Sequence, residues 1–231
     1  MAVIVGLLQV LQRDANAVVA FLPSDHYFAD NAAFVATVQS AINAARKEKE
    51  SIILVGAVPL SPEVEYGWIE PGATVTNVGQ APLLRVNRFW EKPPRATAQE
   101  LVRTGGLWNT FVTIGRAGAF LKLLCSTVPA AVAEFAGALE LGDVERAYRD
   151  ASSIDFSKDV LSVEPGRLLV MRDAASGWVD LGNPDRVVNT LVQNQIEPEW
   201  LLKMRGSVHY KQPNATSPSG RHDCSVAWCA E

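Results

Sequence analysis

Ala17-Val18-Val19-Ala20-Phe21-Leu22-Pro23-Ser24-Asp25-His26 is the stretch that decides the fold of this 231-residue chain. Its first six residues are apolar and the run ends at Pro23, a pattern typical of a short buried strand. The strand would open directly onto Ser24, Asp25 and His26. Ligands of open α/β sheets bind beyond the carboxyl ends of the strands, so Asp25 is the first candidate for a functional carboxylate.

The composition indicates one large globular domain or a small pair of domains. Hydrophobic residues make up 48% of the chain and the net charge is −4. A sizeable core can therefore form, and no basic tract favours nucleic acid or an anionic membrane. No apolar run approaches the roughly 18 residues of a spanning helix. We expect a cytoplasmic protein that binds neither nucleic acid nor membrane.

The N-terminus and the cysteines agree with that compartment. Residues 1–11 are apolar but lack a basic leader, so they predict an amphipathic helix rather than a signal peptide. The three cysteines are an odd number, which favours reduced thiols. Cys125 falls in a helical pattern and is predicted to lie in the core. Cys224 and Cys229 lie near His222, where a metal site is the weaker alternative.

Strands and helices alternate along the chain, which predicts an α/β fold. Asp30 is placed to cap a helix over residues 31–49, and residues 51–56 follow as a second buried strand. This strand–helix–strand order predicts a βαβ unit with parallel pairing. Short β segments are expected near 65–70, strands at 83–90, 107–114 and 167–171, and helices at 96–103, 117–141 (two), 143–150 and from Pro184. The pattern decays after Gly206, so we expect a domain over residues 1–205 and an irregular tail over residues 206–231.

Polar groups stand at the ends of several of these elements: Asp25, Glu91 with Lys92, Asn109, and Asp180. Two carboxylates could hold Mg²⁺, which binds one or two carboxylates and completes its shell with water and phosphate. A lysine could neutralise a phosphate, and Glu91 and Asn109 could hydrogen-bond hydroxyls. Gly67 would let a ligand approach the backbone closely.

Each of these residues also has a purely structural interpretation. Asp25 could be a turn or helix-capping residue, and Asp180 could belong to a plain turn. Glu91 and Lys92 could form a solvated loop, and Asn109 could satisfy a neighbouring backbone group. His26 is more typical of a structural hydrogen-bonder than of a catalyst, because no partnered nucleophile is evident.

Six short motifs follow one another along the chain: Leu22-Pro23-Ser24-Asp25-His26, Tyr66-Gly67-Trp68-Ile69, Phe89-Trp90-Glu91-Lys92-Pro93, Leu107-Trp108-Asn109, Ser153-Ile154-Asp155-Phe156 and Gly177-Trp178-Val179-Asp180-Leu181-Gly182. In this order they resemble the sugar nucleotidyltransferases, and they look most like the mannose-1-phosphate guanylyltransferases. Each motif alone is weak, but the ordered series is specific. The resemblance runs from the N-terminus to about Met204.

The resemblance implies a Rossmann-like α/β fold with a mixed central sheet. It implies transfer of a nucleoside monophosphate from a triphosphate, GTP, to a hexose 1-phosphate, mannose 1-phosphate, with release of pyrophosphate. It also implies roles for individual residues: Asp25 and Asp180 ligate the catalytic Mg²⁺, Lys92 contacts the sugar phosphate, and Glu91, Asn109 and the Gly67 backbone contact the sugar.

The chain departs from the family pattern in two places. No Gly-rich G-x-G-T-R-L loop precedes Asp25, so we expect a partial catalytic domain that lacks the first strand and the triphosphate loop, and that turns over poorly alone. The alternative is a non-catalytic sugar-phosphate-binding or regulatory subunit that pairs with a complete homologue, and a homo- or hetero-oligomer fits either reading. In addition, Phe111 stands where the family often has the glycine of W-N-S-G, which is expected to alter the sugar pocket.

Overall fold

The computed structural model describes residues 1–79, 81–173 and 175–206 of the chain. The chain divides into two compact units, Met1–Asp180 and Leu181–Glu231. All the candidate site residues belong to the first unit. The boundary predicted between residues 205 and 206 stays a prediction, since the expected tail lies almost wholly outside the described residues, as do His222, Cys224 and Cys229.

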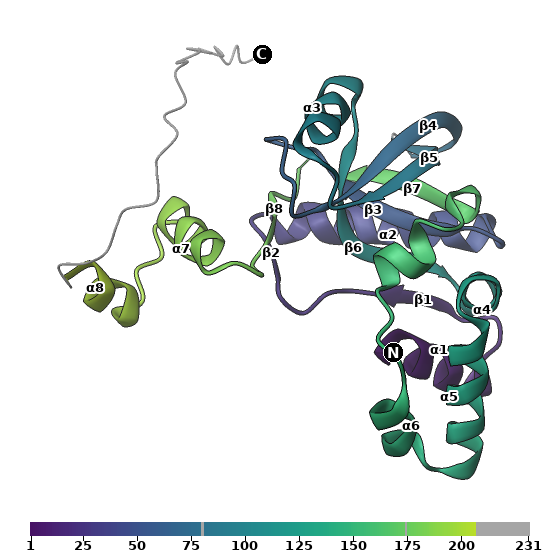
Figure 1. Cartoon of the computed structure of the whole chain (residues 1–231). Coiled ribbons are helices and arrows are strands. Elements are labelled where there is room, and N and C mark those ends of the chain that lie inside the picture. Colours follow the sequence, from purple (N-terminus) through teal and green to yellow (C-terminus); the bar gives the residue numbers. More distant parts are fainter. Residues whose placement is uncertain (80, 174, 207–231) are drawn as a thin grey trace, which may run out of the picture. The chain divides into compact units, whose positions relative to one another are not determined.

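A six-stranded mixed sheet runs through the first unit in the order β1-β6-β3-β7-β5-β4 (Figure 1). Its strands are β1 (Val18–Phe21), β3 (Ile52–Ala57), β4 (Gly67–Val78), β5 (Ala81–Glu91), β6 (Leu107–Arg116) and β7 (Leu168–Asp173). β3 and β7 pair in parallel, and the other pairs are antiparallel. A separate antiparallel ribbon joins β2 (His26–Phe28) to β8 (Trp178–Asp180). The predicted α/β fold with a mixed sheet is confirmed.

β1 and β3 do not pair with each other, so the predicted direct parallel pairing is wrong. β6 lies between them and is antiparallel to both, with Ile114 opposite Ala20 on one side and opposite Ile53 on the other. The two strands therefore run in the same direction as second neighbours. Local sequence order could not reveal this insertion, because β6 comes from far later in the chain.

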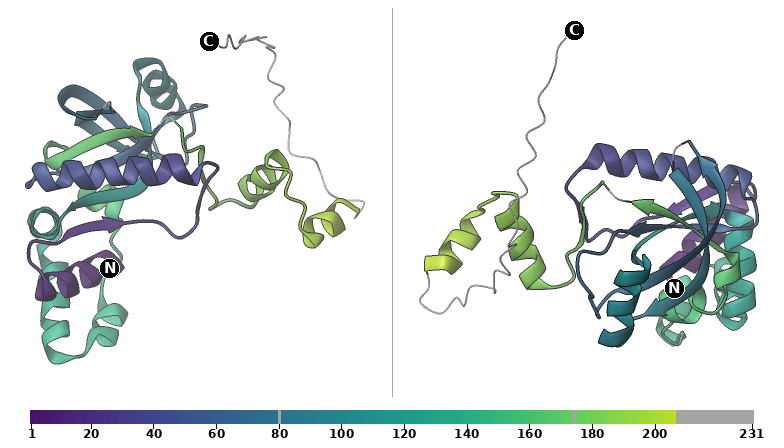
Figure 2. Two further views of the ribbon diagram at one scale, coloured as in Figure 1. Left: turned by 180° about the vertical axis from the view of Figure 1, so that it is seen from behind. Right: turned by 90° about the horizontal axis from the view of Figure 1, so that it is seen from above.

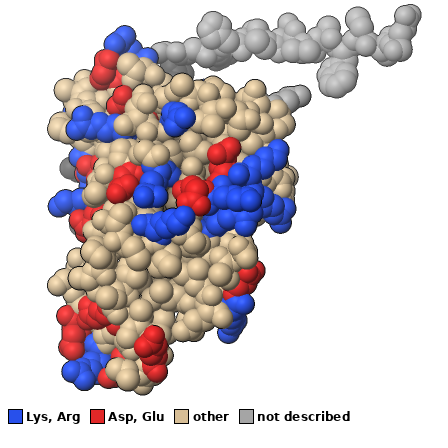
Figure 3. Space-filling model, turned by 90° about the vertical axis from the view of Figure 1, so that its right-hand side faces the viewer, with Lys and Arg blue, Asp and Glu red and all other residues tan. Residues whose placement is uncertain are grey.

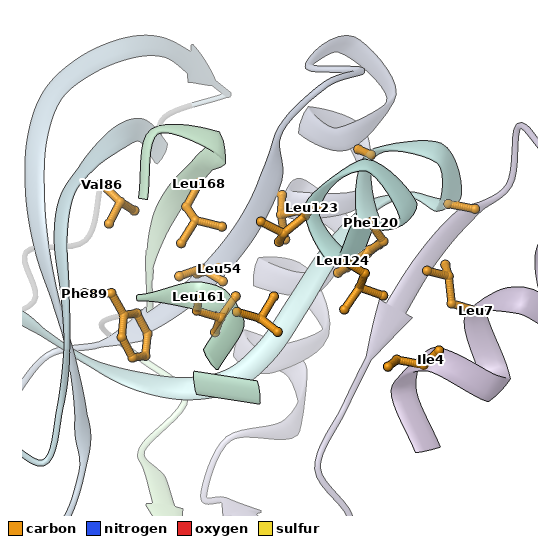
Figure 4. Close-up of a cluster of buried hydrophobic side chains, with 14 of the residues drawn as sticks. Ile4, Leu7, Leu54, Val86, Phe89, Phe120, Leu123, Leu124, Leu161 and Leu168 are labelled. Atoms are coloured by element: carbon orange, nitrogen blue, oxygen red, sulfur yellow. The ribbon is translucent and has the colours of Figure 1, made fainter. Parts of the chain in front are cut away.

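Helices cover both faces of the sheet because the strand side chains alternate between two apolar faces. Ile53 and Val55 pack under α2 (Asn31–Lys47), which crosses one face in the view from behind (Figure 2). Ile52 and Leu54 belong to the opposite cluster, with α1 (Ala2–Arg13) and α4 (Ala117–Thr127) (Figure 4). α5 (Pro129–Leu141) and α6 (Val144–Asp150) extend that second cluster.

The helix ends follow local chemistry. Asp30 caps α2 by accepting from the Ala33 N–H at 2.9 Å, as predicted. α3 (Arg95–Thr104) ends at Gly105, which has a φ of +83°. In the second unit Asn183 caps α7 (Pro184–Gln193), which is followed by α8 (Glu199–Gly206). A π-helical turn, η1 (Phe156–Leu161), and a 3₁₀ turn, η2 (Pro165–Arg167), precede β7.

The surface of the chain carries one cysteine that was expected inside. Cys125 is exposed on α4, so its predicted core position is wrong. The helical periodicity was right, but the thiol lies on the outer side of that helix.

In the described part of the chain, no helix is long and apolar enough to cross a membrane. Basic and acidic side chains lie next to one another on the face shown in Figure 3.

Candidate functional site

A bulge in β6 shapes the centre of the candidate site. Leu54 of β3 pairs with Thr113, but Gly56 pairs with Asn109, so β6 carries extra residues at this point. The hydroxyl of Thr110 donates to the Val55 carbonyl at 2.7 Å and accepts from the Val112 N–H at 3.3 Å. Thr110 thereby satisfies backbone groups that the bulge leaves without ladder partners.

The bulge turns Asn109 toward the start of β4. Its side chain is 4% exposed, and Oδ1 accepts from the Phe111 N–H at 3.2 Å. The structural interpretation of Asn109 therefore holds for its amide oxygen, which satisfies a neighbouring backbone N–H. Its other amide atom, Nδ2, is buried without a hydrogen-bond partner. This amide group therefore keeps one unused hydrogen-bond donor.

Three of the predicted sugar-binding residues meet at one point. Gly67 is paired with Glu91 across β4 and β5. A methyl group added at Gly67 would lie 3.1 Å from Glu91 Oε2 and 3.4 Å from Asn109 Cβ. Glu91 Oε2 is itself buried without a hydrogen-bond partner. A side chain at Gly67 would therefore press against the unpaired Glu91 carboxyl oxygen and against Asn109.

Electrostatics around Glu91 favour its neutral form. Burial raises the pKa of Glu91, and the nearby Asp155 carboxylate raises it further. Lys92 and Ser157 oppose the shift by favouring the charged form. The Ser157 hydroxyl lies beside the carboxylate but forms no well-aligned hydrogen bond, and its side chain is 1% exposed. Glu91 Oε2 could therefore still accept a hydrogen bond from the hydroxyl group of a ligand.

Lys92 follows β5 directly and is exposed, as a phosphate-binding lysine needs to be. Its φ is +45°, in the left-handed region that non-glycine residues rarely adopt. Backbone strain of this kind concentrates at functional sites. The turn directs the chain into Pro93 and Pro94 while Lys92 stays close enough to lower the pKa of Glu91.

The β2–β8 ribbon brings together the two carboxylates predicted to bind a metal ion. His26 stands directly opposite Asp180, and Asp25 Oδ1 lies 4.0 Å from His26 Nε2. Burial lowers the pKa of His26, although Asp180, Asp25 and a hydrogen bond with the Thr110 backbone act to raise it. Asp25 is not a helix cap, because Asp30 fills that role.

The donor chemistry of this pair fits Mg²⁺. Two carboxylates supply the hard oxygen ligands that Mg²⁺ takes, and the Asp25 side chain is 70% exposed, which leaves room for water and phosphate. His26 is not among the donors, because its Nδ1 already accepts from the Trp178 indole N–H. Among the described residues, no group of three or more His, Cys, Asp and Glu side chains is arranged around a common metal position.

Sequence reasoning missed three polar contributors to this site. Trp178 stood in a recognised motif without a role, and Thr110 and Ser157 lay just outside the motifs. Their only sequence signal was adjacency to a predicted residue, because Thr110 follows Asn109 and Trp178 precedes Asp180 by two positions. The contact between Ser157 and Glu91 depends on where η1 packs against β5, which no local pattern encodes.

Comparison with known proteins places the chain in a family. A family model described as nucleotidyl transferase matches residues 1–195. The chain belongs to the nucleotidyl transferase family. The resemblance inferred from the six ordered motifs is thereby confirmed at the level of the family.

Individual nucleotidyl transferase relatives carry more specific names. The xanthan biosynthesis protein XanB of Xanthomonas campestris pv. campestris (strain B100) is 33% identical over 189 residues, covering 79% of this chain and 39% of XanB. A mannose-1-phosphate guanylyltransferase of Escherichia coli (strain K12) is 28% identical over 181 residues, covering 74% of this chain and 37% of the relative. The chain therefore spans about two fifths of the length of these relatives.

A solved structure agrees with the fold. The structure named mannose-1-phosphate geranyltransferase from Thermus thermophilus superposes with a TM-score of 0.73 and 27% sequence identity. The match covers 82% of this chain and 54% of that protein. The nucleotidyl transferase fold of the chain is thus supported by structure as well as by sequence.

Proposed function

We propose that this chain is part of an enzyme that transfers a nucleoside monophosphate from GTP to mannose 1-phosphate, giving a nucleotide sugar and pyrophosphate. The first unit supplies the sugar-phosphate and metal side of the site. The observation that carries the proposal is the pair of unpaired buried atoms, Glu91 Oε2 and Asn109 Nδ2. A carboxylate acceptor and an amide donor beside the open Gly67 backbone suit the hydroxyls of a sugar ring.

The names of the relatives support the choice of substrates. One relative is called mannose-1-phosphate guanylyltransferase, which names both the acceptor and the transferred group. Because the chain spans 37% of that relative, the complete reaction is proposed for the whole enzyme rather than for this chain alone.

The chemistry is a direct displacement at phosphorus. A phosphate oxygen of the sugar 1-phosphate attacks the α-phosphorus of GTP and forms a new P–O bond. The bond between that phosphorus and the bridging oxygen breaks, and pyrophosphate leaves with the electron pair. No covalent protein intermediate is required, so the contribution of the protein is positioning and charge neutralisation.

Each residue has one task in this scheme. Glu91, Asn109 and the Gly67 backbone hold the sugar ring, and Lys92 neutralises its phosphate. Asp25 and Asp180 hold Mg²⁺, which when bound supplies neutralising charge at the phosphate oxygens. The exposure of Asp25 leaves open positions for these oxygens.

A second candidate function is a non-catalytic sugar-phosphate-binding subunit that pairs with a complete homologue. The open edge of β1 favours it, because β1 pairs only with β6 within the described part of the chain. This candidate uses Gly67, Glu91 and Asn109 in the same way but transfers nothing.

Calorimetry with mannose 1-phosphate, and pyrophosphate release in the presence of GTP and Mg²⁺, test the proposal. Gly67→Ala should weaken mannose 1-phosphate binding about tenfold or more, because the new methyl group would lie 3.1 Å from Glu91 Oε2. Gly118→Ala on α4 is the matched control, since a methyl group there meets nothing within 4 Å. Asn109→Ala should weaken binding as well.

The outcomes separate the candidates. Binding without turnover supports the non-catalytic subunit, and turnover that is lost in Asp25→Ala and Asp180→Ala supports the enzyme. Binding that is the same in wild type, Gly67→Ala and Asn109→Ala would contradict the sugar site. Glucose 1-phosphate in parallel shows whether the site prefers mannose.

A further inference from the structure

His26 has no task in the proposed chemistry, yet its side chain is almost fully enclosed. Its side chain is 8% exposed, and the Trp178 indole N–H donates to its Nδ1 at 3.0 Å. A nitrogen that accepts a hydrogen bond carries no proton, so the remaining proton sits on Nε2. Trp178 therefore fixes both the orientation and the tautomer of the imidazole.

The register of the ribbon and the chain order place His26 beside both carboxylates. His26 and Asp180 are direct cross-strand partners, so their side chains project from the same face of the ribbon as that of Trp178. Asp25 directly precedes His26 in the chain, and its Oδ1 lies 4.0 Å from Nε2. The His26 imidazole is therefore a neighbour of both proposed metal ligands, Asp180 and Asp25.

The imidazole also links the ribbon to the main sheet. The imidazole lies near the backbone of Thr110, and Thr110 lies in the β6 bulge next to Asn109. The Thr110 hydroxyl is tied to Val55 and Val112, so this part of the bulge is anchored. The ribbon belongs to a different sheet from β6, and His26 provides a polar connection between them.

We propose that His26 is a positioning residue that sets the separation of the Asp25 and Asp180 carboxylates and their placement relative to Asn109. The Trp178 indole N–H holds the imidazole at Nδ1, and the imidazole lies next to Asp180 across the ribbon and near Asp25. This inference rests on the proposed function, because the two carboxylates matter through the metal ion that they bind. Partners that orient metal ligands in this way typically change metal affinity about tenfold or more when removed.

Binding of Mn²⁺ alone to the full chain, measured by electron paramagnetic resonance, tests this role without relying on turnover. Trp178→Phe keeps an aromatic ring but removes the N–H, and His26→Asn keeps an acceptor near the Nδ1 position but loses Nε2. Both variants should bind Mn²⁺ about tenfold more weakly than wild type. His26→Gln, which restores a donor near the Nε2 position, should recover part of the affinity.

Trp68→Phe is the matched control for lost stability. It belongs to the same aromatic cluster and also loses one indole hydrogen bond, at 2.8 Å to the Glu63 carbonyl, but it does not contact His26. Thermal unfolding of each variant compares the stability losses. Mn²⁺ affinity that falls equally in Trp68→Phe and Trp178→Phe would overturn the positioning role.

Asp25→Asn separates this inference from the proposed function. Wild type that binds no Mn²⁺, or an Asp25→Asn variant that binds it unchanged, overturns the metal assignment and the positioning role together. Loss of binding in Asp25→Asn, with wild-type affinity in Trp178→Phe and His26→Asn, overturns the positioning role alone.

Discussion

Phe111 is held in a backbone conformation that suits glycine. Its φ is +62°, in the left-handed region, and the residue is 41% exposed, so its ring is partly buried. A non-glycine residue in the left-handed region costs of order 1–3 kcal/mol. We expect the free energy of unfolding of Phe111→Gly to exceed that of Phe111→Ala by about 1 kcal/mol in urea denaturation, because both variants lose the ring and only alanine keeps the strain, after allowing for the entropy of glycine.

Phe111→Ala is the control for this prediction. Alanine also removes the ring but keeps Cβ, so the backbone strain stays and no gain in stability is expected. Equal stabilities of the alanine and glycine variants would show that the ring, and not the backbone, was unfavourable. Calorimetry on the glycine variant also tests whether Phe111 narrows the sugar pocket.

Glu91 predicts a pH dependence of stability. Burial raises its pKa in the folded state, so folding favours the protonated form. The stabilisation is complete below the ordinary pKa of a glutamate and is lost as the pH rises through the raised value. Glu91→Gln should therefore unfold at a higher temperature than wild type near neutral pH, and the difference should shrink in acid. If the difference in unfolding temperature between Glu91→Gln and wild type grew in acid, the pKa of Glu91 would be lowered in the folded state rather than raised.

At the residue scale, the candidate residues could be named from the sequence, but their surroundings could not. Asp25, Glu91, Asn109 and Asp180 stood out because they are polar residues at the ends of predicted elements, where ligands of α/β sheets bind. The burial of Ser157 against Glu91 was not recognisable, since the two are joined only by tertiary packing. The same holds for the bond from Trp178 to His26, which spans 152 positions.

At the scale of elements, the β6 bulge depends on one hydroxyl. Thr110→Val removes the partner of the Val55 carbonyl and of the Val112 N–H in a fully buried position. Buried groups left unsatisfied cost about 1–3 kcal/mol, and we expect a loss of that size in urea denaturation. Weaker mannose 1-phosphate binding should accompany it, because the bulge directs Asn109.

Thr113 is the matched control on the same strand. It is 1% exposed, but its hydroxyl has no hydrogen-bond partner. Thr113→Val should therefore be neutral or stabilising, because it replaces an unsatisfied buried hydroxyl with a methyl group. If Thr110→Val and Thr113→Val lost the same stability, the loss would come from placing valine in β6 and not from the hydrogen bonds of the Thr110 hydroxyl.

Features that depend on neighbouring residues in the sequence were predicted well, and features that depend on residues far away in the sequence were not. The α2 cap at Asp30 and the stop of α3 at Gly105 depend on neighbouring residues alone. The length of β4 was underestimated, because Pro71 interrupts its pattern. In the structure β4 continues through Pro71 with register shifts against β5. Pairing partners, such as β6 between β1 and β3, depend on the whole sheet.

At the scale of the whole molecule, the open edge of β1 predicts association between chains. The Ala17 carbonyl accepts from the Ala117 N–H at 2.9 Å, so Ala17, Val19 and Phe21 direct their backbone groups toward β6. Val18 and Ala20 must then direct theirs to the opposite side, where no second strand runs within the described residues. A free strand edge is a template for another strand.

We therefore expect the chain to self-associate as its concentration rises in sedimentation equilibrium. Val18→Pro should weaken this association with little effect on stability, because the lost N–H points to the open edge. Val19→Pro is the matched comparison, since it removes a donor to β6 and should cost about 1 kcal/mol or more. Association that survives Val18→Pro would place the contact elsewhere on the molecule. A monomer at all concentrations would mean that β1 is protected by its short length and by Pro23 beyond its end, as edge strands often are.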